Sequence, residues 1–260
     1  MPNLTTEHIL GFTFIFVRIS AMLVMIPVMG ERSVPLRVKA GLALLIALLV
    51  FPVIHLDMPH LQVDADAEII AITLAMTGEV MIGLIIGFAA SMIFAGIRFA
   101  GDMIGIQMGL SIVNVIDPVS STQVSIMAEF QYLFAMLVYL AVDGHHMFIS
   151  AIFDSYRFVT PFAHHVSASL IQSILMYSKE LFVTAVKICA PVMAVLLFSN
   201  VALGVVARTV PQINVFIVGM PLQVATGLII FGLTIPVFVS VVQRALDSLN
   251  REIQVLMRLM

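Results

Sequence analysis

Six apolar regions, most of them interrupted by a charge or a proline, constrain the fold of this chain more than any other feature. They cover residues 9–30, 36–54, 69–97, 126–142, 180–206 and 213–243. Their length and their content of Leu, Met and Ala predict helices. A helix that spans a bilayer needs about 20 mainly apolar residues with few or no charges, and these regions meet that requirement poorly.

The interruptions indicate what surrounds these helices. Arg18 splits the first region, Glu79 the third and Lys187 the fifth. The sixth region is free of charge, but the sequence GMP at 219–221 and Pro236 are expected to break it. Charge and proline at membrane depth are tolerated where neighbouring protein satisfies them. Much of the chain is therefore predicted to face other protein rather than lipid.

Composition assigns the chain to a membrane. Hydrophobic residues make up 61% of its 260 residues and charged residues only 10%, whereas soluble domains carry about 25% charged residues. The net charge of −3 gives no nucleic-acid footprint. Cys189 is alone in an apolar run, so no disulfide framework is expected. The predicted class is an all-α, membrane-associated protein with about six kinked, apolar helical regions.

The distribution of basic residues does not fit a simple series of crossings. The loop at 30–41 and the C-terminal tail at 243–260 each carry three Lys or Arg residues, which is typical of cytoplasmic segments. Five intervening crossings cannot leave both on one side. Either one region does not cross the membrane, or an assembly overrides the charge rule.

Glycine recurs every four residues in two places. The first pair is Gly83 and Gly87, and the second set is Gly101, Gly105 and Gly109. This spacing puts the glycines on one helix face, where two backbones can approach closely. Ordinary helix packing is one interpretation. The other is that 101–118 forms a pliable constriction, because each glycine weakens a helix by about 1 kcal/mol relative to alanine. Asp117-Pro118 is expected to end that helix.

Charges and histidines inside the apolar sequence are the other candidate sites. Arg18, Glu79 and Lys187 are predicted to be buried charges, either paired with one another or on a proton or ion path. The pairs His145-His146 and His164-His165 resemble metal ligands. Adjacent imidazoles on one helix should point apart, and no carboxylate follows His145 or His146 at helical spacing. Neither a metal nor a cofactor is expected, and the absence of catalytic motifs argues against an enzyme.

Four stretches resemble the FliR family of flagellar biosynthesis proteins, which shares ancestry with the T-type subunits of injectisome export systems. They are VRISAMLVMIPVMGERSVPLRVKAGLAL (17–44), GDMIGIQMGLSIVNVIDP (101–118), DGHHMFISAIFDSYRFVTP (143–161) and APVMAVLLFSNVALGVVARTVPQINVFIVGMPLQVATG (190–227). The combination of RTVPQINVF with GMPL is the most specific part. The resemblance runs over nearly the whole chain.

This resemblance implies a core subunit of the flagellar type III export gate in the bacterial inner membrane, at the flagellar basal body. Its partners would be the P-type and Q-type subunits FliP and FliQ, the B-type switch subunit FlhB, and exported unfolded polypeptides. Residues 1–178 would be a P-like part and residues 179–260 a Q-like helical hairpin with a C-terminal helix. Part of the assembly would stand on the periplasmic side.

The resemblance also implies two sites. A loop at 106–122 would plug the pore through Ile106, Gln107, Met108, Gly109, Leu110, Ile112, Val113, Asn114, Val115 and Ile116. An apolar loop can close a channel by dewetting and packing. The hairpin tip would face the cytoplasm with Arg208, Thr209, Pro211, Gln212 and Asn214. An injectisome subunit, a passive scaffold, and a secondary transporter that uses Arg18 and Glu79 are the alternative interpretations.

Overall fold

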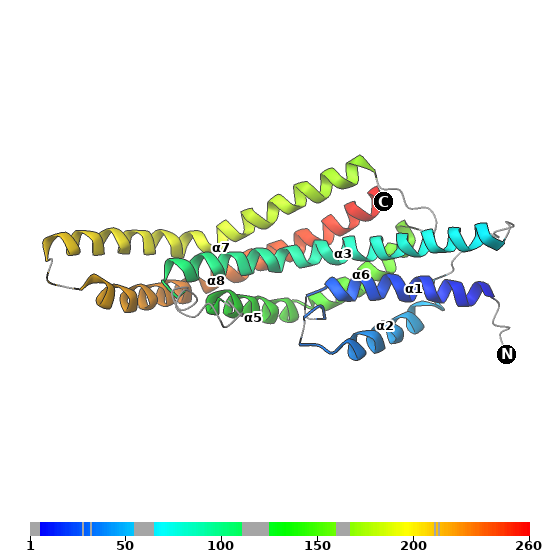
Figure 1. Cartoon of the computed structure of the whole chain (residues 1–260), viewed down its shortest axis with the longest axis horizontal. Coiled ribbons are helices and arrows are strands. Elements are labelled where there is room, and N and C mark those ends of the chain that lie inside the picture. The colour runs from blue at the N-terminus through cyan, green and yellow to red at the C-terminus, as the bar shows by residue number, and fades with distance from the viewer. Residues whose placement is uncertain are drawn as a thin grey trace. The chain divides into compact units, whose positions relative to one another are not determined.

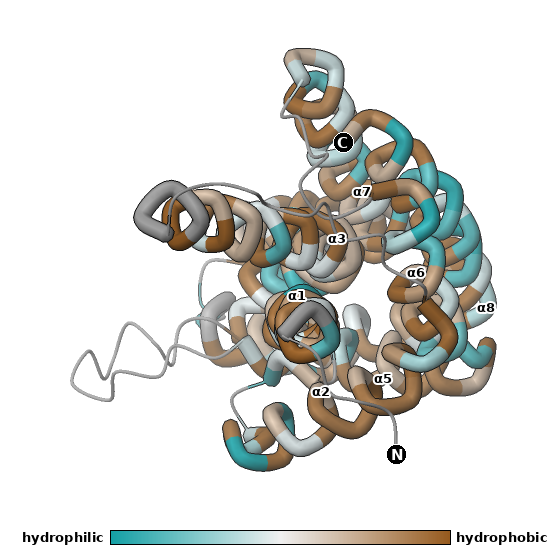
Figure 2. Tube along the Cα trace, turned by 90° about the vertical axis from the view of Figure 1, so that its right-hand side faces the viewer, coloured by the Kyte–Doolittle hydropathy of each residue, from teal (hydrophilic) through white to brown (hydrophobic). Residues whose placement is uncertain are grey.

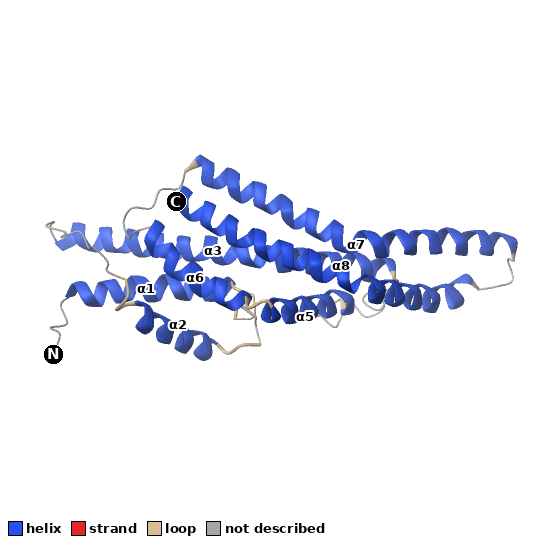
Figure 3. Ribbon diagram, turned by 180° about the vertical axis from the view of Figure 1, so that it is seen from behind, coloured by secondary structure: helices blue, strands red, loops and turns tan. Residues whose placement is uncertain are grey.

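The chain is all-helical in the computed structural model, which describes residues 6–27, 29–31, 33–54, 65–110, 125–159, 167–210, 212 and 214–260. These residues form helices and loops without a strand (Figures 1 and 3). The helices are α1 (Thr6–Met25), α2 (Leu36–Val50), α3 (Ala65–Gln107), α5 (Ile126–Ala141), α6 (Gly144–Phe158), α7 (Ala168–Thr209) and α8 (Val215–Leu259).

Four of these helices are long and apolar enough to cross a membrane, namely α1, α3, α7 and α8. A fifth crossing is possible if α5 and α6 together form one broken span. Hydrophobic residues dominate the trace of the described helices in Figure 2. The predicted all-α membrane class is therefore confirmed.

The structure differs from the sequence expectation in three elements. The prediction that region six would be broken was wrong, because α8 continues through Pro221 and Pro236. A proline removes one backbone hydrogen bond from a helix, and the turns on either side preserve the rest. The sequence also missed α6, whose residues are amphipathic rather than uniformly apolar. Finally, α3 ends at Gln107, ten residues before the expected stop at Asp117-Pro118.

The chain folds into two compact units that do not follow its linear order. Unit 1 contains residues 1–92, 143–178 and 247–260, and unit 2 contains residues 93–142 and 179–246. Helices α3, α7 and α8 each contribute residues to both units. The predicted division into a P-like part and a Q-like hairpin concerns likeness to partner subunits rather than compactness of the fold. It stays a prediction.

In unit 1, the first half of α3 packs closely on α1. A Cβ at Gly83 would lie 2.5 Å from the carbonyl oxygen of Arg18, and one at Gly87 would lie 2.6 Å from the Cβ of Met25. Both distances are shorter than side-chain contacts allow, so only glycine permits this approach. Glu79, Gly83 and Gly87 recur every four residues, and they therefore share the face of α3 that meets α1.

In unit 2, aromatic side chains join α5 to α8. Phe130 and Phe231 are 5.8 Å apart between ring centroids, and Phe134 and Phe238 are 5.5 Å apart. The unit 2 parts of α7 and α8 run antiparallel as a hairpin (Figure 1), and the side chains of Asn200 and Gln223 are hydrogen-bonded across it.

Candidate functional site

The segment proposed as a plug begins inside a helix. Ile106 and Gln107 are the last residues of α3, and Met108, Gly109 and Leu110 form the turn that follows. Gly109 has a φ of 80°, a left-handed conformation that favours glycine. The four-residue spacing predicted that Gly109 would share the helical face of Gly101 and Gly105. That prediction was wrong, because the helix has ended before Gly109.

The remaining plug residues lie outside the described part of the chain. They are Ile112, Val113, Asn114, Val115 and Ile116. The structure does place the residues on both sides of them. The structure describes the chain up to Leu110 and again from Ser125, which is the N-cap of α5. We call residues 101–110 together with 125–132 the loop root.

Two glycines hold the two sides of the loop root together. A Cβ at Gly101 would lie 2.5 Å from the Cα of Ala128 and 2.8 Å from its backbone nitrogen. A Cβ at Gly105 would lie 2.9 Å from the Oγ of Ser125. That hydroxyl also accepts a hydrogen bond from the backbone N–H of Ala128, at 3.3 Å, and so caps α5. The C-terminal end of α3 and the start of α5 are thus in direct contact.

Met108 fixes the loop root to α8. Its side chain is fully buried, and a Cβ at Gly227 would lie 2.7 Å from the Cγ of Met108 and 2.8 Å from its sulfur. The flexible thioether therefore occupies space that the missing side chain of Gly227 leaves on α8. Ile106, by contrast, is 60% exposed. Of the described plug residues, Met108 is buried in the root, whereas Ile106 is exposed.

Gln131 is an unsatisfied polar group within the loop root. Its side chain is fully buried in α5, and neither of its amide atoms has a hydrogen-bond partner. A buried polar group left without partners costs about 1–3 kcal/mol. Nothing in the sequence singles out this glutamine, because a lone amide in an apolar helix can equally well lie on an exposed face.

We expect Gln131→Leu to raise the free energy of unfolding by about 1–3 kcal/mol, because the new side chain has a similar size and no polar atoms to leave unpaired. The measurement is thermal denaturation of the detergent-solubilised protein. Gln172→Leu in the first turns of α7 is a control at an exposed position, where a change within about 0.5 kcal/mol is expected. Destabilisation by Gln131→Leu would mean that the amide has a partner in the assembled protein.

A second site, in unit 1, is a buried ion pair between α1 and α3. Arg18 and Glu79 are both fully buried. The Nε of Arg18 donates to one carboxylate oxygen of Glu79 at 2.5 Å, and its Nη2 donates to the other at 2.9 Å. Such a two-pronged contact matches the planar guanidinium to the carboxylate.

Helix α6 completes this network. The Nη1 of Arg18 donates to the carbonyl of Ser155 at 2.9 Å and to its hydroxyl at 3.2 Å, and Nη2 donates to the carbonyl of Val159 at 3.1 Å. All five guanidinium donors therefore have acceptors. The Arg18 Cζ lies 4.0 Å from the centroid of the Tyr156 ring, whose hydroxyl donates to the carbonyl of Ile15 at 3.3 Å. Nothing in the sequence links these α6 residues to Arg18.

Lys187 does not join this network. The prediction of a third buried charge was wrong for the single chain, because Lys187 lies on an exposed face of α7. The helical period explains the difference: Ala185, Ile188 and Cys189 point inward and are buried, whereas Lys187 lies on the other side.

The predicted hairpin tip lies at the junction of α7 and α8. Arg208 and Thr209 end α7 and are exposed, and so are Gln212 and Asn214 in the link to α8. Pro211 lies outside the described residues. The hydroxyl of Thr209 donates to the carbonyl of Val205 at 3.1 Å, which closes the last turn of the helix.

The histidine pair at the start of α6 also departs from expectation. The imidazoles of His145 and His146 do not point apart, since their ring centroids are 4.2 Å from each other. A carboxylate is also close by, because Asp143 precedes the helix three residues before His146. The expectation from the sequence considered only acids that follow the histidines and did not consider Asp143, which precedes them. His164 and His165 lie outside the described residues.

The fold defines a multi-pass, all-helical membrane protein with a buried ion pair inside its helical core. The chain belongs to the family described as bacterial export proteins, family 1, which matches residues 9–249 and is the family of the flagellar biosynthetic protein FliR. This membership gives the chain a role related to flagellar protein export.

Individual relatives match this chain over most of their length. The chain is 36% identical to the flagellar biosynthetic protein FliR of Bacillus subtilis (strain 168), over 93% of this chain and 92% of the relative. It is 29% identical to FliR of Escherichia coli (strain K12), over 91% and 90%. It is 28% identical to FliR of Aquifex aeolicus (strain VF5), again over 91% and 90%.

Proposed function

We propose that this chain is a core subunit of the flagellar type III export gate, and that its loop at 106–122 closes the channel through which unfolded flagellar proteins leave the cell. The observation that carries the proposal is the closed loop root. Gly105 and Ser125 meet at its base, so the two ends of the proposed plug segment are held close together by packed helices.

The contacts of the root suit a plug that must stay in place and yet yield. Gly101 and Gly105 allow α3 and α5 to touch, while Met108 fastens the turn to α8. Gly109 supplies the left-handed residue from which the loop departs. A rigid root holds the two ends of the proposed plug segment in one position.

Partner subunits of the P and Q types are proposed to cover the hairpin of α7 and α8. Large apolar side chains remain exposed along it, among them Phe198, Ile217 and Leu233, each more than 70% exposed. Gly204 and Gly232 have open space around them, which leaves room for another helix backbone. The B-type switch subunit is proposed to contact the tip at Arg208–Asn214 from the cytoplasm, with part of the assembly on the periplasmic side.

A passive scaffold is the competing function, because the same root would also brace a purely structural loop. The secondary-transporter alternative has less support. Arg18 and Glu79 satisfy each other and α6 completely, so they leave no donor for a substrate. Injectisome use is disfavoured by relatives that are flagellar proteins.

The test is ion conductance of the assembled complex across a lipid bilayer. Deleting residues 112–116 should produce a leak while the complex still assembles, because loss of several large apolar side chains removes a few kcal/mol of packing and shifts the closed–open balance strongly. Deleting five residues from the link at 55–64 is the matched control and should leave the bilayer tight. An assembled 112–116 deletion that conducts no more than wild type would assign closure to another subunit.

A further inference from the structure

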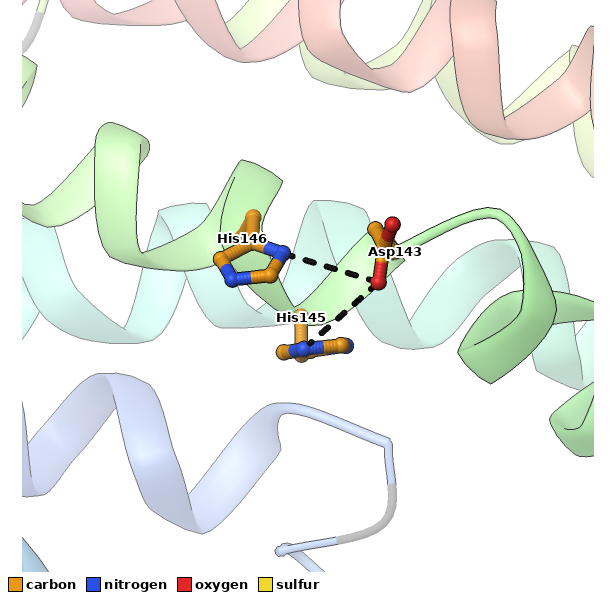
Figure 4. A group of neighbouring side chains, drawn as sticks. All are labelled: Asp143, His145 and His146. Atoms are coloured by element: carbon orange, nitrogen blue, oxygen red, sulfur yellow. Dashed lines mark ion pairs between the residues drawn. The ribbon is translucent and has the colours of Figure 1, made fainter.

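Three side chains of types that commonly ligate metals meet at the start of α6. The Nε2 of His145 lies 3.9 Å from the Oδ1 of Asp143, and the Nδ1 of His146 lies 3.7 Å from the same oxygen. Figure 4 shows both imidazoles turned toward that carboxylate. All three side chains are exposed, and their donor atoms lie within 4.8 Å of one another.

Asp143 is held in an unusual position for a residue before a helix. It occupies the N-cap of α6 with a φ of 56°, in the left-handed region, and its side chain makes no capping hydrogen bond. An aspartate at this position ordinarily turns its carboxylate to the first N–H groups of the helix. Here the carboxylate remains available and faces the two histidines instead.

We propose that Asp143, His145 and His146 bind a divalent first-row transition metal ion such as Zn²⁺, with water in the remaining position. Imidazole nitrogen suits zinc, nickel and copper, and one carboxylate with two histidines is a familiar ligand set. Ligand bonds of about 2.0–2.2 Å in a tetrahedral site place donor atoms about 3.3–3.6 Å apart. The two distances to Asp143 exceed this range by a few tenths of an ångström. The donor atoms of the two imidazoles lie within 4.8 Å of each other, and rotation of the exposed side chains must bring them closer as well.

One effect opposes metal binding here. The N-terminus of a helix carries partial positive charge and disfavours a cation. The helix dipole weakens metal affinity by roughly two- to fivefold at an exposed position. Removing a group that only orients a metal ligand already lowers metal affinity by about 10–100-fold. The contribution of three direct ligands, one of them anionic, therefore outweighs the helix dipole.

The competing explanation is an ion pair between Asp143 and protonated histidines. A titration of Co²⁺ or Zn²⁺ into the full chain, purified in the membrane assembly in which it is stable, separates the two. We expect one equivalent per chain to bind, with affinity reduced at least about tenfold by Asp143→Asn, His145→Ala or His146→Ala. Asparagine tolerates the left-handed conformation, so the first variant removes the charge and retains the fold.

The double variant His164→Ala/His165→Ala is the matched control, because that pair has no acid three residues before it. It should bind metal as wild type does. X-ray absorption of the loaded protein should show imidazole nitrogen and carboxylate oxygen at about 2.0–2.2 Å. The proposal fails if no equivalent binds, or if binding survives in the His145→Ala/His146→Ala double variant. Loss of binding only in the His164/His165 control would also overturn it.

Discussion

Arg18→Met is expected to destabilise the protein by about 3–5 kcal/mol. The substitution leaves the carboxylate of Glu79 buried without its counter-charge, and removing one partner of a buried pair has this cost. It also deprives the Ser155 and Val159 carbonyls of their donor. Glu79→Met should have a comparable effect, because it leaves the Arg18 guanidinium buried without the carboxylate that accepts two of its hydrogen bonds. The measurement is thermal denaturation of the detergent-solubilised protein.

The double variant Arg18→Met/Glu79→Met distinguishes a charge effect from general loss of packing. It should be considerably more stable than the sum of the two single effects predicts, because no unpaired charge remains. Lys187→Met is the control, since it removes a charge that is exposed in this chain and should change stability by less than about 0.5 kcal/mol. Simple additivity of the two single variants would contradict a coupled ion pair.

Gly101→Ala is expected to destabilise the loop root by about 1–3 kcal/mol and to impair export. The new Cβ would lie 2.5 Å from the Cα of Ala128 and 2.9 Å from the carbonyl oxygen of Met127. These are backbone atoms that no side-chain rotation can move, so α3 and α5 must separate. Overpacking of this kind typically costs 1–3 kcal/mol, and it would shift the two sides of the plug loop relative to each other.

Gly41→Ala provides a control for the glycine effect, because a Cβ at that position of α2 meets nothing within 4 Å. Alanine is the better helix former by about 1 kcal/mol, so this variant should be neutral or stabilising. Stability is read from thermal denaturation, and export from the amount of flagellar protein secreted. If both variants behave alike, close approach of α3 and α5 at Gly101 has no role.

The helices themselves follow closely from the sequence. Long runs of Leu, Met, Ala and Phe satisfy their backbone within a membrane as helices, and each predicted region lies largely within one. The boundaries were less accurate, because α3 extends from Ala65 to Gln107 and α8 continues through two prolines. Helix α6 was missed because its mixture of polar and apolar residues gives no long apolar run.

The candidate sites also separate into local features that the sequence predicts and long-range contacts that it does not. Four-residue spacing correctly placed Gly83 and Gly87 on one packed face, since that spacing is a local property of a helix. It failed at Gly109, where the helix has already ended and the backbone has turned left-handed. It could not identify Gly227 as the neighbour of Met108, because more than a hundred residues of chain separate the two.

The sequence by itself determined the class of protein, most of its helices and its family, because hydropathy and helical period are encoded in neighbouring residues. Only the tertiary structure decided which groups meet. It pairs Arg18 with Glu79 and then with α6, leaves Lys187 exposed, and closes the loop root through Gly101 and Gly105. The physical reason is that these contacts depend on how helices far apart in the chain pack, and packing is set by the shapes of both surfaces at once.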